Sequence, residues 1–213
     1  MNHHSPIAAE GFPLIAVPAV FAVIALAFGW RIPAAILGLL ALFVVWFFRN
    51  PERKITGNAK LIVSPADGKI LRVDEVAGHG LLEGSLNKIS IFMSVLNVHV
   101  NRMPCDGVIE DVRYHEGRFV SANLDKASQD NERNELLIRM PNGNKMLVVQ
   151  IAGFIARRIV CRAVQDMRLQ KGERFGLIRF GSRVEVFLPG GTRIMVSAGD
   201  KVRGGETPIA ELP

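Results

Sequence analysis

Four short stretches of the sequence carry side chains that could take part in catalysis. They offer a carboxylate, an imidazole, basic groups and hydroxyls, which serve for proton transfer, nucleophilic attack and anion binding. The groups are those of Asp67 in Ser64-Pro65-Ala66-Asp67-Gly68, His99 and Arg102 in the stretch 97–104, Lys126, Ser128 and Arg133 in the stretch 126–133, and Ser182 after Gly181. Because these stretches lie far apart along the chain, only a fold that returns on itself could bring them together.

The Gly181-Ser182 pair has a particular reactivity. Glycine places no side chain near its carbonyl and permits a strained turn, so the neighbouring hydroxyl can reach that carbonyl. In isolation such a pair is typical of an ordinary turn, and the same holds for Asp67 before Gly68. His99 lies among apolar β-branched residues, where a neutral imidazole is more often structural, although histidine is readily tuned near neutral pH.

The chain after residue 54 alternates between short strand patterns and turns. Turn signals that combine proline and glycine stand at 65–68, 141–143 and 189–191. Segment 155–164 suits either a helix or a buried strand, and segment 121–130 is typical of a loop. The domain at 55–213 is therefore expected to be mainly β, with strands at 60–64, 68–73, 88–93, 97–101, 107–114, 135–140, 145–151, 183–188 and 193–197.

The N-terminal part is apolar, and residues 11–48 contain one charged side chain, that of Arg31. At about 1.5 Å per residue, the uncharged run 11–30 covers the roughly 30 Å of a bilayer's hydrocarbon core. The run 32–48 is shorter and ends in an aromatic cluster. One helix through both runs would overshoot the membrane, so we expect a transmembrane helical hairpin within a membrane anchor at 1–54.

Charges that flank the hairpin predict its orientation. Arg49, Arg53 and Lys54 follow the second run, while only Arg31 lies at the tip. The positive-inside rule then places both ends of the hairpin, and the β domain, on the cytoplasmic side of the cell's inner membrane. A cleaved signal peptide is the alternative. However, the sequence has no basic region before the first apolar run, and a signal peptide would leave the second run unexplained.

The net charge of +6 favours an anionic lipid surface as a partner. The aromatic residues do not interleave with basic ones as in nucleic-acid-binding surfaces, so no nucleic-acid partner is expected. Cys105 and Cys161 have no CxxC spacing and predict neither a disulfide framework nor a metal site.

The C-terminal stretch 196–210 has glycines spaced for two tight turns around a short strand. Its Gly-Asp-x-Val-x-x-Gly-Glu phrase, at 199–206, resembles the hammerhead turn of biotinyl and lipoyl carrier barrels. The resemblance predicts a barrel-sandwich hybrid (biotinyl/lipoyl-like) architecture and says nothing about activity.

The four catalytic stretches, in this order and behind a membrane hairpin, resemble the short form of the phosphatidylserine decarboxylase family over nearly the whole chain. The resemblance implies self-cleavage between Gly181 and Ser182, through an ester and then dehydroalanine, into a β chain, 1–181, and an α chain, 182–213, that stay together as a heterodimer. It implies a pyruvoyl cofactor made from Ser182, which takes phosphatidylserine as a Schiff base and accepts the electrons released with CO2, giving phosphatidylethanolamine.

The family's residue roles are carried over only in part. His99 matches the general acid that reprotonates the product, and Asp67 matches an aspartate of the self-processing machinery. Long-form relatives carry a second histidine where this chain has Arg102. Either His99 serves both steps, or another group such as His115 deprotonates Ser182. The predicted substrate contacts are Arg102, Lys126, Ser128 and Arg133.

A non-enzymatic alternative is a membrane-tethered biotinyl or lipoyl-like adaptor or carrier. Such a domain needs a modifiable lysine at a hairpin tip, and Lys145 after the turn at 141–143 is the faint match. Another pyruvoyl enzyme, acting on a free amino acid, would leave the hairpin without a purpose.

Overall fold

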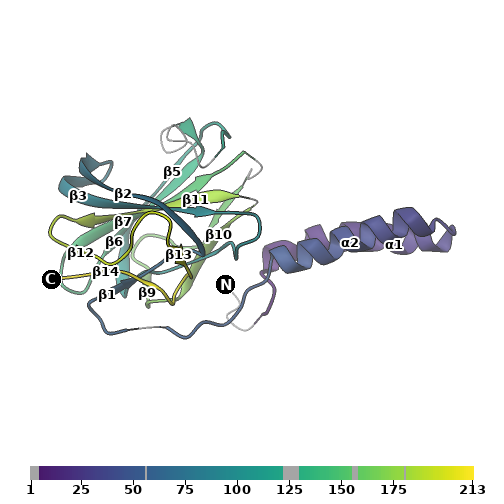
Figure 1. Ribbon diagram of the computed structural model, residues 1–213, viewed down its shortest axis with the longest axis horizontal. Helices are drawn as coiled ribbons and strands as arrows, with labels where there is room; N and C mark the ends of the chain where they lie inside the picture. The colour runs from purple at the N-terminus through teal and green to yellow at the C-terminus, as the bar shows by residue number, and fades with distance from the viewer. Residues whose placement is uncertain (1–4, 56, 122–129, 155–157, 180) are drawn as a thin grey trace. The chain divides into compact units, whose positions relative to one another are not determined.

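The structure is a computed structural model that describes residues 5–55, 57–121, 130–154, 158–179 and 181–213. It divides into two compact units, Met1–Glu52 and Arg53–Pro213. The first is helical and the second is built of β-strands (Figure 1). The prediction of a mainly β protein with N-terminal helices is therefore confirmed.

The helical unit is a hairpin of α1 (Phe12–Ala27) and α2 (Arg31–Phe47), with a short 3-10 turn, η1 (Ala9–Gly11), before α1. Gly29 adopts a φ of 74° in the turn between the helices, which a glycine does without strain. The open end is closed by hydrogen bonds, among them one of 2.8 Å from the Ala8 amide to the Phe48 carbonyl. The helical stretch Ala9–Ala27 is long and apolar enough to cross a membrane, while the apolar Arg31–Phe47 is shorter.

Three antiparallel sheets form the second unit. The largest curls around the core (Figure 1) and has the order β13 (Lys201–Val202), β2 (Gly68–His79), β3 (Leu82–Met93), β11 (Ser182–Pro189), β7 (Lys145–Ala152), β6 (Arg133–Arg139), β5 (Gly107–His115), β9 (Arg168–Leu169). The two smaller sheets have the orders β1 (Leu61–Val63), β14 (Pro208–Glu211), β12 (Arg193–Ile194) and β4 (Val100–Arg102), β10 (Arg174–Ile178), β8 (Ile159–Cys161).

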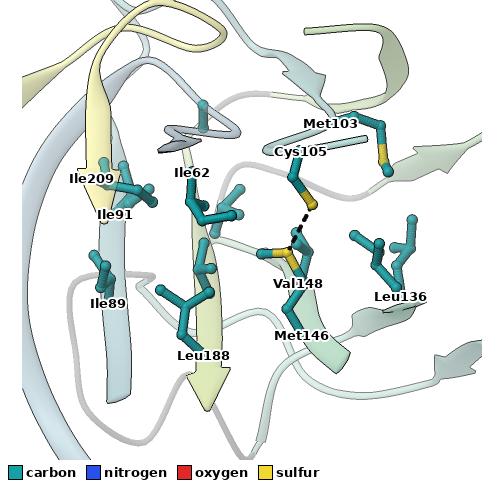
Figure 2. Close-up of a cluster of buried hydrophobic side chains, with 14 of the residues drawn as sticks. Ile62, Ile89, Ile91, Met103, Cys105, Leu136, Met146, Val148, Leu188 and Ile209 are labelled. Atoms are coloured by element: carbon teal, nitrogen blue, oxygen red, sulfur yellow. Dashed lines mark hydrogen bonds between the residues drawn. The ribbon is translucent and has the colours of Figure 1, made fainter. Parts of the chain in front are cut away.

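The main core lies between these sheets, and Figure 2 shows part of it. Ile89, Ile91 and Leu188 from the large sheet meet Ile62 and Ile209 from a small one. Burying such side chains completely contributes about 1.5–3 kcal/mol each. Cys105 lies in the same cluster with its thiol 3.4 Å from the Met146 sulfur, and burial raises its pKa to about 12.

Each predicted strand of the β domain overlaps an observed one, but three differences bear on function. The strands after the first turn are longer than predicted, because β2 and β3 continue into a hairpin that ends between His79 and Leu82. The strand predicted at 97–101 begins only at Val100, so His99 lies outside it. The short β9, β10, β13 and β14 were not predicted.

The structure describes only parts of the two segments 155–164 and 121–130, which the sequence patterns did not assign to a strand or a helix. The described part of 155–164 contains the strand β8, which agrees with a strand rather than a helix, although its three residues are half-buried and not fully buried. The segment 122–129 lies outside the described residues, and Lys126 and Ser128 lie outside with it.

Candidate active site

Ser182 is the first residue of β11 and lies between two strands. It is paired with Met93 at the end of β3 on one side and with Ala152 at the end of β7 on the other. Its side chain is fully buried, and its hydroxyl lies 3.4 Å from the Met93 sulfur. A thioether is a weak acceptor, so this contact holds the hydroxyl less firmly than an oxygen acceptor would.

The residue before it, Gly181, has a φ of 72°, in the left-handed region that favours glycine. A Cβ placed on Gly181 would have only Val95 Cγ1 near it, at 3.9 Å. The requirement for glycine therefore comes from backbone conformation and not from crowding.

His99 contacts the backbone of Gly181, the residue before Ser182. Its Nε2 lies 3.3 Å from the Gly181 amide nitrogen, and its Nδ1 lies 3.0 Å from the Asn97 carbonyl oxygen. Since a carbonyl can only accept, Nδ1 carries the proton, and Nε2 directs its lone pair at the Gly181 N–H. The buried His99 is thus a neutral base whose Nε2 accepts from the N–H of Gly181, one residue before Ser182.

Local structure explains how His99 reaches this position. The Asn97 side chain accepts hydrogen bonds from the amide and hydroxyl of Ser94, at 2.9 and 2.8 Å, and closes a turn after β3. The carbonyl of His99 then accepts a bond from the Ile178 amide, at the end of β10. His99 therefore binds both ends of the connection from β10 to Ser182.

Asp67 is held by other partners. Its Oδ2 lies 2.8 Å from Arg53 Nη2, and its Oδ1 accepts a bond of 2.8 Å from the Gly204 amide. Arg53 also binds Glu206 at 3.1 Å. The turn at 64–68 is thus tied to the C-terminal turns, and the contacts described for Asp67 are with Arg53 and Gly204 and not with Ser182.

Arg102 follows His99 by three residues and is buried. Its Nη1 donates to the Gly172 carbonyl at 3.0 Å, and its amide donates to the Pro65 carbonyl at 2.8 Å. The latter bond joins β4, which follows His99, to the turn that carries Asp67. The role of Arg102 as a substrate contact stays a prediction.

Arg133 and His115 lie on the opposite face of the large sheet from Ser182. Facing residues of adjacent strands point to one side, and the register aligns His115, Arg133, Ile151 and Arg183 in one row. Ser182 belongs to the next row, so its side chain points the other way. Arg133 and His115 both bind Glu135, at 3.1 and 3.4 Å.

The structure adds residues that the sequence patterns did not single out for the site. Met93 meets the Ser182 hydroxyl, and its sulfur also lies 3.7 Å from the Asn101 amide nitrogen. Asn101 in turn accepts a bond of 2.8 Å from Gln150. A strand-end methionine and a mid-strand glutamine have no sequence signal of their own, because only the register of β3, β7 and β11 places them here.

Asn131 is a further fully buried residue near Ser182. Its amide group donates to the carbonyl of Ala152 at 2.6 Å and exchanges two bonds with the backbone of Val120. It therefore fixes the end of β7, against which Ser182 pairs.

A cavity of about 920 Å³ opens elsewhere in the β unit. It is lined by residues of β5, β9 and the β6–β7 turn, including Asp106, Arg139 and Arg168. Neither Ser182 nor His99 is among its lining residues, so this cavity is separate from the candidate active site.

Comparison with known proteins gives the family of the chain. The family model for phosphatidylserine decarboxylase matches residues 40–210. The phosphatidylserine decarboxylase proenzyme of Syntrophus aciditrophicus is 51% identical over 210 residues, covering 98% of this chain and 99% of that protein. Those of Geotalea uraniireducens and Geobacter metallireducens are 45% and 46% identical, with 100% of this chain and 99% of each relative covered.

These matches span both the helical and the β unit, and the range matched by the family model contains positions 99, 181 and 182. The chain belongs to the phosphatidylserine decarboxylase family.

Proposed function

We propose that the chain is a proenzyme that cleaves itself between Gly181 and Ser182 and then decarboxylates phosphatidylserine to phosphatidylethanolamine. The observation that carries this proposal is the contact of His99 Nε2 with the Gly181 amide nitrogen, 3.3 Å away, in the residue that precedes the buried Ser182. The family uses a pyruvoyl group formed by such self-cleavage.

The residues present suit the cleavage step. The Ser182 hydroxyl attacks the Gly181 carbonyl carbon, a C–O bond replaces the C–N bond, and the hydroxyl proton moves to the freed nitrogen. His99 Nε2 lies 3.3 Å from the nitrogen of Gly181, the residue whose carbonyl is attacked, and as a base it can carry the hydroxyl proton to the Ser182 nitrogen. Loss of the Ser182 α-proton then expels the ester, leaving a Gly181 carboxylate and dehydroalanine, and hydrolysis of dehydroalanine releases ammonia.

The fold also suits a new terminus at residue 182. After the cut, β11 is still paired with β3 over Ser182–Pro189 and with β7 over Ser182–Phe187. The fragment 182–213 also supplies β12, β13 and β14, and β14 pairs with β1 of the larger fragment. We therefore expect the two fragments to stay together as a heterodimer.

A pyruvoyl group at residue 182 would stand where the Ser182 side chain now lies, enclosed by Met93 and Ala152. Such a group supplies an electron sink for the pair released when the carboxylate leaves. His99, whose Nε2 lies 3.3 Å from the nitrogen of the preceding Gly181, would return a proton to the substrate's α-carbon.

Electrophoresis under denaturing conditions with intact-mass measurement tests the cut. We expect two fragments that correspond to residues 1–181 and 182–213, the smaller one blocked to Edman degradation and carrying a ketone. A full-length chain that nevertheless decarboxylates phosphatidylserine would overturn the proposal.

Gly181 provides a test of the left-handed backbone conformation before Ser182. A side chain in the left-handed conformation costs about 1–2 kcal/mol, so Gly181→Ala should slow self-cleavage roughly tenfold while leaving the fold intact. Gly84→Ala is the matched control, since Gly84 has a φ of 85° and no atom within 4 Å of its Cβ position. Equal cleavage half-times for the two variants would remove the conformation of Gly181 from the mechanism.

Asp67 enters the proposal as a positioning residue for self-processing. It anchors the turn whose Pro65 carbonyl binds the Arg102 amide, three residues from His99. Asp67→Asn keeps an acceptor for the Gly204 amide but loses the ion pair with Arg53. We expect slower cleavage and a lower melting temperature in this variant.

Arg53→Met is the comparison for Asp67→Asn, because it breaks the same pair from the other side. If Asp67 acts by positioning, cleavage rate and melting temperature fall together in both variants. A loss of cleavage in Asp67→Asn with an unchanged melting temperature would instead make Asp67 a direct participant.

For the architecture, we propose a barrel-sandwich hybrid in the domain at 55–213. The curled large sheet, the two small sheets and the C-terminal turns at Gly199 and Gly205, with φ of 101° and 81°, support it. The carrier alternative has less support, because the Lys145 amine is bound to Glu110 at 2.7 Å.

For the helical unit, we propose a membrane anchor at 1–54 with the β domain on the cytoplasmic side of the inner membrane. The exposed apolar side chains of both helices support this, since large residues such as Val23, Ile32 and Leu39 are exposed along them. The positive charges after the second helix support the orientation.

A further inference from the structure

Two loops border the Gly181-Ser182 bond, one on each side of it. Ser182 is paired with Met93 and with Ala152, which are the last residues of β3 and β7. The chain leaves these strands in the same direction, toward Leu96 on one side and Phe154 on the other. Val95, next to Leu96, lies 3.9 Å from the Cβ position of Gly181.

Both loops present large apolar side chains to solvent. Phe154 is 71% and Leu96 is 63% exposed, the two highest values among the large hydrophobic residues that the structure describes in the β unit. A single exposed apolar residue is ordinary, but two at the rim of one buried site indicate a surface that is covered in use.

Basic residues accompany this rim. The Arg179 amide donates to the Arg158 carbonyl at 3.2 Å, and Arg179 precedes Gly181 by two residues. Arg158 is exposed and Arg179 is half-buried. Apolar and basic residues on the segments that border one site suit a layer that offers acyl chains next to phosphates.

We infer that the tips of Leu96 and Phe154 enter the interfacial layer of an anionic phospholipid bilayer, with Arg158 and Arg179 at the level of the phosphates. This inference rests on the proposed function, because it concerns how a lipid headgroup reaches residue 182. That residue is fully buried. A rim that enters the bilayer lets the headgroup move into the site while the acyl chains stay in the membrane.

If the rim enters the bilayer, removing its apolar side chains should lower kcat/KM for a substrate in the bilayer but not for a substrate dissolved in water. Full-length protein in proteoliposomes would be compared as wild type, as Leu96→Ser/Phe154→Ser and as the control Val164→Ser/Met195→Ser. The control removes two exposed apolar side chains that the contacts above do not place at the rim. The substrates are long-chain phosphatidylserine in the same bilayer and a short-chain phosphatidylserine dissolved below its micelle concentration.

For the rim variant we expect kcat/KM on the bilayer substrate to fall about tenfold or more, with less than about a twofold change on the dissolved substrate. Self-cleavage and the control variant should be unaffected. Equal losses on both substrates would place the two side chains in the chemistry, and no loss on either would leave them without a role; both results overturn the inference. A wild type that neither cleaves nor decarboxylates would instead overturn the proposed function.

A second measurement is independent of activity. Phe154→Trp would be made in a chain in which Trp30 and Trp46 are replaced by phenylalanine, so that the new indole is the sole tryptophan. We expect its fluorescence to be quenched by lipids that carry a spin label near the headgroup end of an acyl chain. Met195→Trp in the same background should not be quenched, and equal behaviour of the two probes would contradict insertion of the rim.

Discussion

Ser182→Ala should yield a single full-length chain with no decarboxylase activity. The variant keeps the backbone pairing of residue 182 with Met93 and Ala152 but lacks the hydroxyl that would attack the Gly181 carbonyl. Without the cut, no keto group forms at residue 182, so activity should fall below detection. Intact mass and a phosphatidylserine decarboxylation assay on the same preparation measure both effects.

Loss of the hydroxyl should lower the free energy of unfolding only slightly, because the hydroxyl contacts the Met93 sulfur, which is a weak hydrogen-bond acceptor. The melting temperature therefore separates a chemical defect from a folding defect. Ser197→Ala is the matched control, since Ser197 is exposed and belongs to the same fragment, 182–213. Fragments of normal size from Ser182→Ala would show that the cut lies at another bond.

His99→Ala is expected to lose turnover more surely than it loses cleavage. A positioned general acid typically contributes 10²–10⁴-fold to a rate, so kcat of the processed fraction should fall by at least about a hundredfold. Cleavage turns over once per chain and can be followed for hours, so a slower cut can still reach completion. Single-turnover cleavage and steady-state decarboxylation, measured on one preparation, separate the two effects.

His115→Ala is the control for the identity of the base. His115 lies on the face of the sheet opposite to Ser182 and contacts Glu135 at 3.4 Å. We expect it to cleave and to turn over like wild type. Arrested cleavage in this variant would assign the first proton transfer to His115, and full activity of His99→Ala would remove His99 from the mechanism.

Local chemistry was sufficient to predict several elements. The hairpin follows from two apolar runs separated by a glycine-containing turn, and α1 and α2 lie within one to three residues of the predicted limits. The β6–β7 turn follows from Pro141-Asn142-Gly143, where Gly143 has a φ of 83°. These features depend on neighbours in sequence, so a pattern of residues is enough to predict them.

Patterns failed where a residue depends on a distant partner. His79 stands between two glycines and resembles a loop residue, yet its ring stacks on Phe187 at 4.2 Å and burial lowers its pKa. The strand β10 contains Gly176, which weakens a strand signal, but a side chain there would stand 2.2 Å from the Val160 carbonyl. Both positions are explained by packing across the sheet.

The sequence alone thus determined the chemical groups of the site: a serine after a conformationally free glycine, a histidine and an acidic turn. The tertiary structure decided which of these groups meet. The register of β3, β7 and β11 buries Ser182, and the β4–β10 pairing brings His99 to the Gly181 amide, while Asp67 binds Arg53. The reason is physical: residue type sets reactivity, but contact between segments tens of residues apart depends on strand pairing, which no local pattern encodes.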